Sequence, residues 1–326
     1  MSSPTALAAV AAFRPLLAEC EAFLAQAVAG YRRELADPAA DTLAAGGKRI
    51  RPLLVFCCAP NDALHDRDRR AALVQAAAAV ELVHMATLVH DDLLDDAGLR
   101  RGRPTVAAAH GPATAIGTGD FLFARAFGVL TETERPDAVR HLATAALGLS
   151  RGEMDQNQAA FDLDLSEGDY LARCRRKTGA LFAVACRLGA LIGGADAAAQ
   201  ENLATFGDHV GLAFQIFDDI LDVAGSPEQT GKRRGTDLRD GTVTLPVIYA
   251  LRHEPALRQA IGAADSDADR EALCDHLARH PGTAAARERA LAYVSTARAA
   301  VEEGPTGGAT TAALREIADG VVDRYA

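Results

Sequence analysis

A helical repeat of apolar residues runs through almost the whole chain. Apolar side chains recur every three to four residues, in segments that are rich in alanine and poor in aromatic and β-branched residues. Aromatic residues make up only 5% of the 326 residues, and tryptophan is absent. No alternating pattern of useful strand length appears, and no repeat of solenoid period. The sequence therefore predicts an all-α protein.

Proline, glycine and aspartate residues separate the helical segments and predict where they end. A first helix is expected from about Thr5 to Leu35, and Pro38 and Gly46-Gly47 precede a second that begins near Arg51. Further helices are expected over residues 68–96, 112–130, 136–160, 166–192, 197–223, 242–252, 254–279, 283–302 and 308–325. No linker-like segment divides the chain, so we expect a single-domain helical bundle over residues 1–326.

Charge and cysteine usage narrow the class of protein. The net charge is −10, which argues against a general nucleic-acid binder with a basic face. The six cysteines show no CxxC pair or zinc-like spacing. This pattern predicts reduced cysteines in a cytoplasmic protein. The apolar N-terminal run ends at Arg14 without a preceding basic region, so no signal peptide is expected. No run of eighteen apolar residues occurs, so no transmembrane segment is expected.

An acidic cluster ends one of the most apolar helical segments. Asp91 and Asp95 are four residues apart and share a helix face, and His84 falls nearly on that face. Burying carboxylates is unfavourable unless a cation compensates them. Taken alone, this DDxxD pattern is equally consistent with a solvated acidic helix end.

A second copy of the pattern, at Asp218, Asp219 and Asp222, also lies in an apolar helix. Two such clusters predict a shared metal site, and carboxylate oxygens without histidine or cysteine partners suit Mg²⁺. Because Mg²⁺ usually binds through a few carboxylates plus substrate phosphates, the implied substrate is a diphosphate.

Four basic clusters complete the pattern of a diphosphate site. Each is by itself more often a solvated charge run. Two of them, however, directly follow the two acidic clusters, as expected if one diphosphate binds through metal and another through Arg and Lys. The clusters are residues 46–52, 100–104, 175–179 and 231–235.

Seven segments in order resemble the trans-isoprenyl diphosphate synthases, or polyprenyl synthetases. They are GGKRIRP at 46–52, HDDLLDD at 90–96, LRRGRPT at 99–105, GDFLFARAF at 119–127, KTGALF at 177–182, FQIFDDILD at 214–222 and GKRRGTDLRDGTVTLP at 231–246. The resemblance implies an isoprenoid synthase type of helical bundle with a central substrate cavity. It also implies a homodimer and a transfer of an allylic chain onto isopentenyl diphosphate. One departure is Arg233, where family members often have proline.

The resemblance also implies a role for each matching residue. Asp91, Asp92, Asp95, Asp218, Asp219 and Asp222 would bind a magnesium cluster, of about three ions, around the allylic diphosphate. Arg100, Lys177 and Lys232 would contact that diphosphate as well. Isopentenyl diphosphate would bind Lys48, Arg51, His84 and Arg101, although His84 is also open to a structural role in the core. Thr178 and Gln215 would face the reacting carbons, where neutral dipoles stabilise a cation without trapping it.

Two small residues bear on product length. In the family, bulky residues four and five positions before the first aspartate close the pocket early, and here these positions are Thr87 and Ala86. We therefore expect a product that is longer than farnesyl diphosphate. This product would be geranylgeranyl diphosphate or a longer polyprenyl diphosphate. Other side chains could still form the floor of the pocket, namely those of Val83, Phe121, Leu122 and Phe127.

Other readings stay open at this point. His84 and His90-Asp91 are compatible with a helical metal phosphohydrolase, which would not explain the second DDxxD. A terpene cyclase would share the acidic motifs but would not need Lys48, Arg51 and Arg101. A regulatory subunit of a heteromeric prenyl synthase, or a helical protein without catalysis, would not need both intact aspartate clusters. The last 80 or so residues carry no motif that we can assign.

Overall fold

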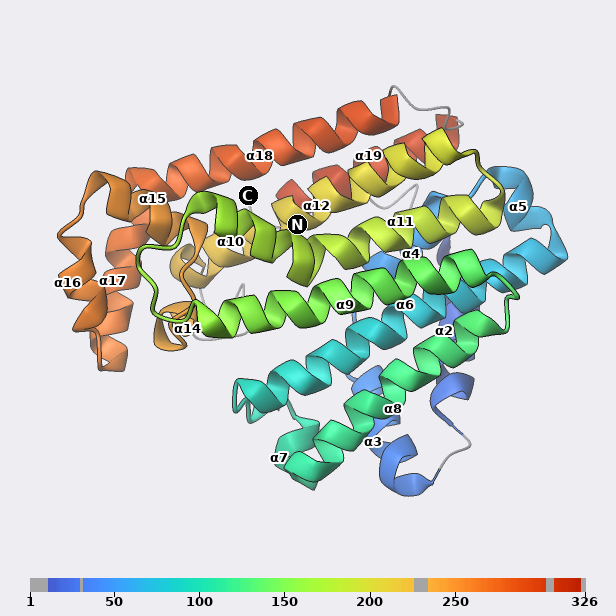
Figure 1. The fold of residues 1–326 in the computed structure, drawn as a ribbon, viewed down its shortest axis with the longest axis horizontal. Coiled ribbons are helices and arrows are strands. Elements are labelled where there is room, and N and C mark those ends of the chain that lie inside the picture. The colour runs from blue at the N-terminus through green and yellow to red at the C-terminus, as the bar shows by residue number, and fades with distance from the viewer. Residues whose placement is uncertain (1–10, 30–31, 226–233, 303–307, 324–326) are drawn as a thin grey trace. The chain divides into compact units, whose positions relative to one another are not determined.

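The computed structural model describes residues 11–29, 32–225, 234–302 and 308–323. Within them the protein is all-α, as predicted, apart from one hairpin of two-residue strands (Figure 1). The chain divides into two compact units. The first comprises residues 1–146, 181–207 and 300–317, and the second comprises residues 147–180, 208–299 and 318–326. Several of these boundaries fall inside helices, and the single-domain organisation stays a prediction.

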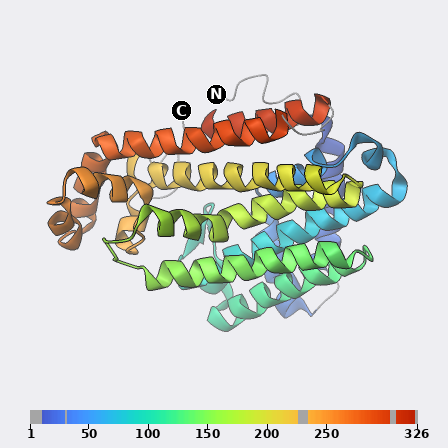
Figure 2. The same ribbon diagram turned by 45° about the horizontal axis from the view of Figure 1, so that its top comes forward.

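The first unit is built around the long helix α6. Its elements are α2 (Arg14–Val28), α3 (Arg33–Ala44), α4 (Ile50–Cys57), α5 (Asn61–His65), α6 (Arg67–Leu94), β1 (Leu99–Arg100), β2 (Arg103–Pro104), α7 (Val106–His110) and α8 (Pro112–Thr131). It also contains the start of α9 (Pro136–Gln158), most of α11 (Ala180–Gly193), the start of α12 (Ala197–Ala224), the end of α18 (Pro281–Glu302) and most of α19 (Gly308–Asp323). Helices α6 and α8 lie side by side (Figures 1 and 2). Asp66 begins α6 by accepting hydrogen bonds from the backbone N–H groups of Asp68 and Arg69.

Helix α6 is the one described helix that is long and apolar enough to cross a membrane, by length and composition alone. However, 72% of its most apolar window is buried inside the protein. All residues from Ala76 to Val83 are buried. A long apolar helix that is mostly covered by its own protein is a core helix of that protein.

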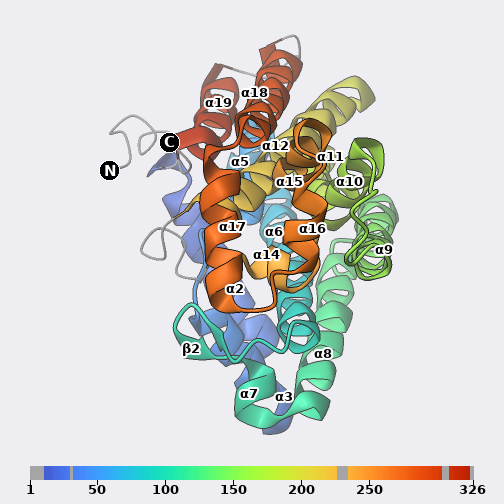
Figure 3. The same cartoon turned by 90° about the vertical axis from the view of Figure 1, so that its left-hand side faces the viewer.

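The second unit contains the C-terminal part of the second long apolar helix and most of the C-terminal part of the chain. Its elements are the end of α9, then α10 (Glu167–Cys174), the π-helical turn η1 (Arg175–Gly179), the end of α12, α14 (Thr236–Arg239), α15 (Leu245–His253), α16 (Leu257–Gly262), α17 (Asp267–Arg279), most of α18 and the end of α19. Helices α15, α16 and α17 pack together, in orange in Figure 3.

Two predicted helices are interrupted in the structure. The helix expected from Thr5 to Leu35 is wrong as a single element, because α2 ends at Val28 and a new helix starts at Arg33; its first residues lie outside the described part. Pro38 lies inside this new helix and does not end it. The helix expected over 254–279 is likewise two helices, because Ser266 forms a capping box that starts α17.

Candidate active site

The first aspartate motif lies at the C-terminal end of α6. Asp91 and Asp92 occupy the last turn of the helix, and Asp95 is its C-cap. Asp92 is buried, and its Oδ1 accepts a hydrogen bond from Arg100 Nε at 2.7 Å. Asp91 is half-buried and Asp95 is exposed. A buried carboxylate needs a charged partner of this kind. The motif therefore combines one anchored carboxylate with two that are more accessible.

A tight hairpin follows this motif and carries two of the predicted arginines. Its strands β1 and β2 are joined by Arg101 and Gly102, whose φ angles are 53° and 74°. Two left-handed residues form a type I′ turn, whose twist matches that of the flanking strands. Arg101 Nη1 donates a hydrogen bond to the carbonyl oxygen of Gly46. The hairpin thus brings the 99–105 segment against the 46–52 segment, as expected if both serve one ligand.

Arg49 in the 46–52 segment is a structural cation. Its Nη1 lies 2.8 Å from Glu81 Oε1, and its Nε also binds Glu21. The side chains of Arg49 and Glu81 are only 9% and 5% exposed. Removing one member of such a buried pair leaves the other charge uncompensated, which destabilises a protein strongly.

Arg51, two residues later, is half-buried and is held differently. Its guanidinium carbon lies 4.7 Å from the centroid of the Phe182 ring, a cation–π contact. Its buried Nε has no hydrogen-bond partner among the described residues. Burial lowers the pKa of Arg51 to about 10. The Arg51 guanidinium is thus positioned by an aromatic ring and keeps one N–H donor unpaired among the described residues. Such a group is suited to bind an anion.

His84 lies among these arginines. Burial, and then the positive charges of Arg51, Arg101 and Arg100, hold the pKa of His84 well below its ordinary value. The imidazole is therefore neutral at neutral pH. The structure thus brings together four residues that were predicted to bind the isopentenyl and allylic diphosphates, namely Arg51, His84, Arg100 and Arg101.

A neutral His84 should make stability depend on pH. The unfolded chain binds a proton at this histidine as the pH falls through about 6.5, whereas the folded chain does not. The contribution of the neutral His84 to the free energy of unfolding is therefore fully present above about pH 6.5 and is lost as the pH falls below it. Between about pH 7 and 5.5 we expect wild type to lose about 1 kcal/mol more free energy of unfolding than His84→Gln. Urea unfolding at several pH values measures the free energy of unfolding. If wild type and His84→Gln lost the same amount between about pH 7 and 5.5, a neutral His84 would be contradicted.

The second aspartate motif lies near the C-terminal end of α12. Asp219 is buried and accepts two hydrogen bonds, from Tyr170 Oη to Oδ2 at 2.7 Å and from Gln215 Nε2 to Oδ1 at 2.8 Å. Burial raises the pKa of Asp219 to about 6, although both hydrogen bonds act in the opposite direction. Asp218 is exposed. The motif therefore repeats the design of the first, with an anchored carboxylate beside an accessible one.

Thr178 and Gln215, which we expected to act together, are in direct contact. Thr178 Oγ1 donates a hydrogen bond to Gln215 Oε1 at 2.7 Å, and Gln215 in turn donates to Asp219. The chain of hydrogen bonds fixes the orientation of the Gln215 amide. These two neutral dipoles are thereby tied to the second aspartate motif.

Lys177 and Thr178 lie in the π-helical turn η1 between α10 and α11. Single π-helical turns inside α-helices occur frequently at functional sites. Lys177 Nζ lies 2.6 Å from Glu153 Oε2 of α9. A Cβ atom at Gly152 would lie 2.8 Å from the backbone nitrogen of Lys177, so only glycine allows α9 to approach η1 this closely.

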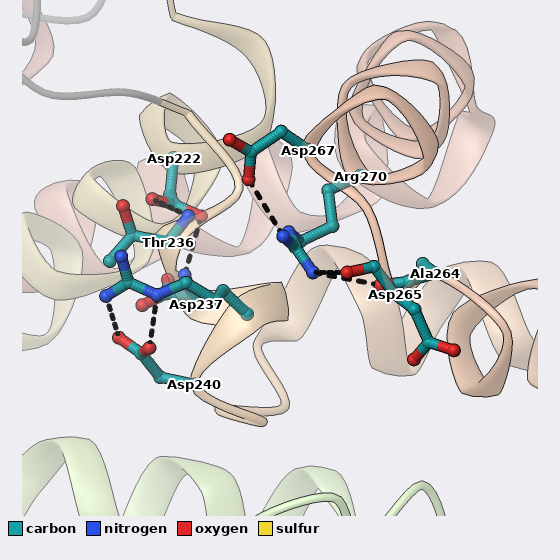
Figure 4. A network of polar contacts seen from close by, with 9 residues as sticks. Asp222, Thr236, Asp237, Asp240, Ala264, Asp265, Asp267 and Arg270 are labelled. Carbon is teal, nitrogen blue, oxygen red and sulfur yellow. Dashed lines mark hydrogen bonds and ion pairs between the residues drawn. The ribbon is translucent and has the colours of Figure 1, made fainter.

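Asp222, the last residue of the second motif, binds the segment that follows α12. Its Oδ1 accepts a hydrogen bond from the backbone N–H of Thr236 at 3.2 Å, and its Oδ2 accepts one from Asp237 at 3.1 Å (Figure 4). Both carboxylate oxygens are thus oriented by the start of α14. The predicted Lys232, together with Arg233, lies outside the described residues.

The two positions expected to govern product length lie on α6. Ala86 is fully buried, whereas Thr87 is half-buried and its hydroxyl donates to the carbonyl oxygen of His84 at 2.8 Å. Phe121 and Leu122 are buried on α8, the main packing partner of α6.

Comparison with known proteins identifies the chain. The polyprenyl synthetase family model matches residues 32–277. The chain belongs to the polyprenyl synthetase family. Component 2 of the heptaprenyl diphosphate synthase of Geobacillus stearothermophilus is 45% identical over 253 residues, which cover 78% of each chain. The nonaprenyl diphosphate synthase of Mycobacterium tuberculosis is 39% identical over 260 residues, covering 78% of this chain and 76% of that enzyme.

Solved structures of polyprenyl synthetases have the same fold. The polyprenyl synthase of Caulobacter crescentus, complexed with calcium and isoprenyl diphosphate, matches with a TM-score of 0.90 and 33% identity over 100% of both chains. The heptaprenyl diphosphate synthase of Staphylococcus aureus matches with a TM-score of 0.90 and 28% identity, covering 96% of this chain and 99% of that one.

As a polyprenyl synthetase, the protein is a prenyltransferase that acts on diphosphate substrates. The alternatives of a metal phosphohydrolase and of a helical protein without catalysis are therefore wrong. The fold prediction of an isoprenoid synthase type of helical protein is confirmed.

Sequence reasoning missed several side chains that support the polyprenyl synthetase motifs. Tyr170 anchors Asp219, Glu153 binds Lys177, and the buried Arg173 donates to the carbonyl oxygen of Val243 at 2.7 Å. Tyr170 precedes Asp219 by 49 residues, so no local spacing relates them. The only available signal was that a buried tyrosine hydroxyl needs a partner.

A histidine cluster elsewhere in the second unit has the spacing of a metal site but the wrong proton arrangement. Ligand atoms of Glu254, His276 and His280 lie within 4.8 Å of one another. The backbone N–H of Gly282 donates to His280 Nδ1 at 2.9 Å, and His280 Nε2 lies 3.7 Å from Glu254 Oε2. A metal-binding histidine instead donates from its other ring nitrogen. We interpret the cluster as a histidine–carboxylate contact.

Proposed function

We propose that this polyprenyl synthetase condenses isopentenyl diphosphate with an allylic diphosphate and makes a trans-polyprenyl diphosphate longer than farnesyl. The observation that carries the proposal is the shared design of the two aspartate motifs, each of which has one buried, hydrogen-bonded carboxylate beside an accessible one. The names of the heptaprenyl and nonaprenyl relatives support a long product.

We propose that Mg²⁺ binds to the more accessible carboxylates, which are those of Asp91, Asp95, Asp218 and Asp222. The donor set fits the ion, because Mg²⁺ binds carboxylate oxygens and usually adds the oxygens of substrate phosphates. Asp92 and Asp219 are buried and hydrogen-bonded to the protein, and we assign them to orienting the site. The number of ions, expected to be about three, stays a prediction. The calcium bound in the Caulobacter crescentus neighbour supports a divalent cation.

The reaction begins when the allylic C–O bond breaks and its electron pair leaves with the diphosphate. Bound magnesium would supply electrostatic stabilisation of this leaving group. Arg100 and Lys177 add positive charge to it, as would Lys232, and each is a charge-assisted donor. Asp92 and Glu153 hold Arg100 and Lys177 in place.

The second substrate would bind through its own diphosphate to Lys48, Arg51, His84 and Arg101. Its double bond attacks the allylic cation to form the new C–C bond, and the departing pyrophosphate takes the proton that is then lost. Thr178 and Gln215 stabilise the cation as fixed neutral dipoles. No side-chain base is needed for this step.

Small side chains at Ala86 and Thr87 would leave space for a growing chain along α6. One helical turn spans about 5.4 Å, which is enough for roughly one isoprene unit. We therefore expect Ala86→Phe to shorten the longest product by one or more isoprene units. Chromatography of products by chain length measures this.

The control for Ala86→Phe is the same substitution at Ala77. Ala77 is equally buried, but it precedes Ala86 by nine residues and so lies on the opposite face of α6, about 180° away. Both variants overpack the core and should lose about 1–3 kcal/mol of stability. Only the change at Ala86 should shift product length, and an unchanged distribution would place the end of the pocket elsewhere.

We propose that the protein works in the cytoplasm as a homodimer. The relatives named component 2 raise a second possibility, in which the chain is the catalytic member of a heteromeric synthase. Both intact aspartate motifs favour a catalytic chain over a regulatory one.

The proposed function is tested with the purified chain, Mg²⁺ and labelled isopentenyl diphosphate. Dimethylallyl, geranyl, farnesyl and geranylgeranyl diphosphates are supplied separately as starters, with EDTA as the control. A metal-dependent ladder of products is expected, and its longest member gives the product length. No incorporation from any starter would contradict a stand-alone synthase and favour the heteromeric form. Cyclic products would favour a terpene cyclase.

A further inference from the structure

Arg234 fastens the segment after the second aspartate motif to helix α17. Its Nε donates to Glu271 Oε1 at 2.6 Å, and its Nη2 also binds Asp275 Oδ1. The Arg234 side chain is only 14% exposed, whereas the two carboxylates are about half exposed. A guanidinium that binds two carboxylates has its position fixed more firmly than a single ion pair would fix it.

The residues directly after Arg234 bind Asp222. The backbone N–H of Gly235 donates to the carbonyl oxygen of Asp222 at 2.8 Å, and the next two N–H groups donate to its carboxylate (Figure 4). Gly235 has a φ of 75°, and a Cβ atom there would lie 3.0 Å from Cys274 Sγ of α17. Glycine is therefore needed for this backbone to fit against α17.

We propose that Arg234 is a positioning residue, which sets the orientation of Asp222 through its attachment to Glu271 and Asp275. Asp222 and Asp218 are four residues apart and share a face of α12. A carboxylate oriented in this way strengthens the cation site of the second motif. The inference rests on the proposed function, because it assumes that this motif binds a divalent cation. It also gives a role to the C-terminal region, in which the sequence shows no motif.

A second arginine in the same region provides a matched control. Arg270 of α17 binds Asp267 and the carbonyl oxygens of Ala264 and Asp265, and its side chain is 18% exposed (Figure 4). It is therefore as buried and as well bonded as Arg234. Its hydrogen bonds, however, hold the turn before α17, whereas those of Arg234 hold the segment that binds Asp222.

The test measures cation binding directly as well as turnover. Binding of Mn²⁺ in the presence of inorganic pyrophosphate is followed by electron paramagnetic resonance for wild type, Arg234→Gln, Arg234→Lys and Arg270→Gln. We expect Arg234→Gln to bind Mn²⁺ roughly 10- to 100-fold more weakly, as is typical when a supporting contact to a metal ligand is lost. Arg234→Lys should recover part of this loss, and Arg270→Gln should match wild type.

The dependence of the rate on Mg²⁺ concentration distinguishes a positioning role of Arg234 from a general loss of structure. The Mg²⁺ concentration for half-maximal rate should rise by the same factor in Arg234→Gln, with the rate at saturating Mg²⁺ within about threefold of wild type. Equal cation affinities in wild type and Arg234→Gln would overturn the inference and leave the proposed function intact. No Mn²⁺ binding by wild type would overturn both. If Arg234→Gln does not fold, Asp275→Asn takes its place: weaker binding supports the inference, and unchanged binding overturns it.

Discussion

Asp91→Asn is expected to lower kcat by about 10³-fold or more, which corresponds to roughly 4 kcal/mol of transition-state stabilisation. Asp91 is the less buried member of the first Asp-Asp pair, and its neighbour Asp92 is already bound by Arg100. Loss of its charge would therefore weaken the cation that neutralises the leaving diphosphate. The fold should change little, because removing one of several like charges at the end of α6 relieves repulsion.

Steady-state rates at increasing Mg²⁺ concentration measure this effect, with circular dichroism as the check on folding. The matched control is Asp96→Asn. Asp96 is an exposed aspartate of the same segment, with a φ of 49°, a conformation that asparagine tolerates. The control should keep nearly full activity. Equal losses in both variants would show that only the total negative charge at this helix end matters.

The second large expected effect is on substrate binding by Arg51, compared with the effect on stability of Arg49, two residues earlier. Arg51→Met should raise the KM for isopentenyl diphosphate by roughly 10- to 100-fold, because charge-assisted hydrogen bonds worth about 1.5–3 kcal/mol are lost. The KM for the allylic substrate should change little. The stability of this variant should stay within about 1 kcal/mol of wild type, because Arg51 is held by a cation–π contact with Phe182.

Arg49→Met should behave in the opposite way. It should lose about 3–5 kcal/mol of stability, because Glu81 would be left as a buried, unpaired charge. Urea unfolding measures this loss, and Arg49→Met combined with Glu81→Met should recover most of it. A large KM effect in Arg49→Met, or a large stability loss in Arg51→Met, would reverse the roles that the contacts assign.

These two arginines illustrate what local sequence could not separate. Both belong to one basic cluster, and either could face a ligand. The tertiary structure places Glu21 and Glu81 beside Arg49 and an aromatic ring beneath Arg51. Those partners come from distant parts of the chain, so no spacing within residues 46–52 encodes them.

The sequence by itself determined the class of fold, the helices with strong periodicity, and the residue types of the site. The 3.6-residue repeat indicates which side of a helix is buried, and the DDxxD spacing places carboxylates on one face of a helix; both are local properties. Only the tertiary structure decided which carboxylates are anchored. Tyr170 reaches Asp219 across 49 residues, and Arg234 reaches α17 across 37 or more. Such contacts depend on packing between segments that are distant in sequence, and hydrogen-bond geometry exists only once that packing has formed.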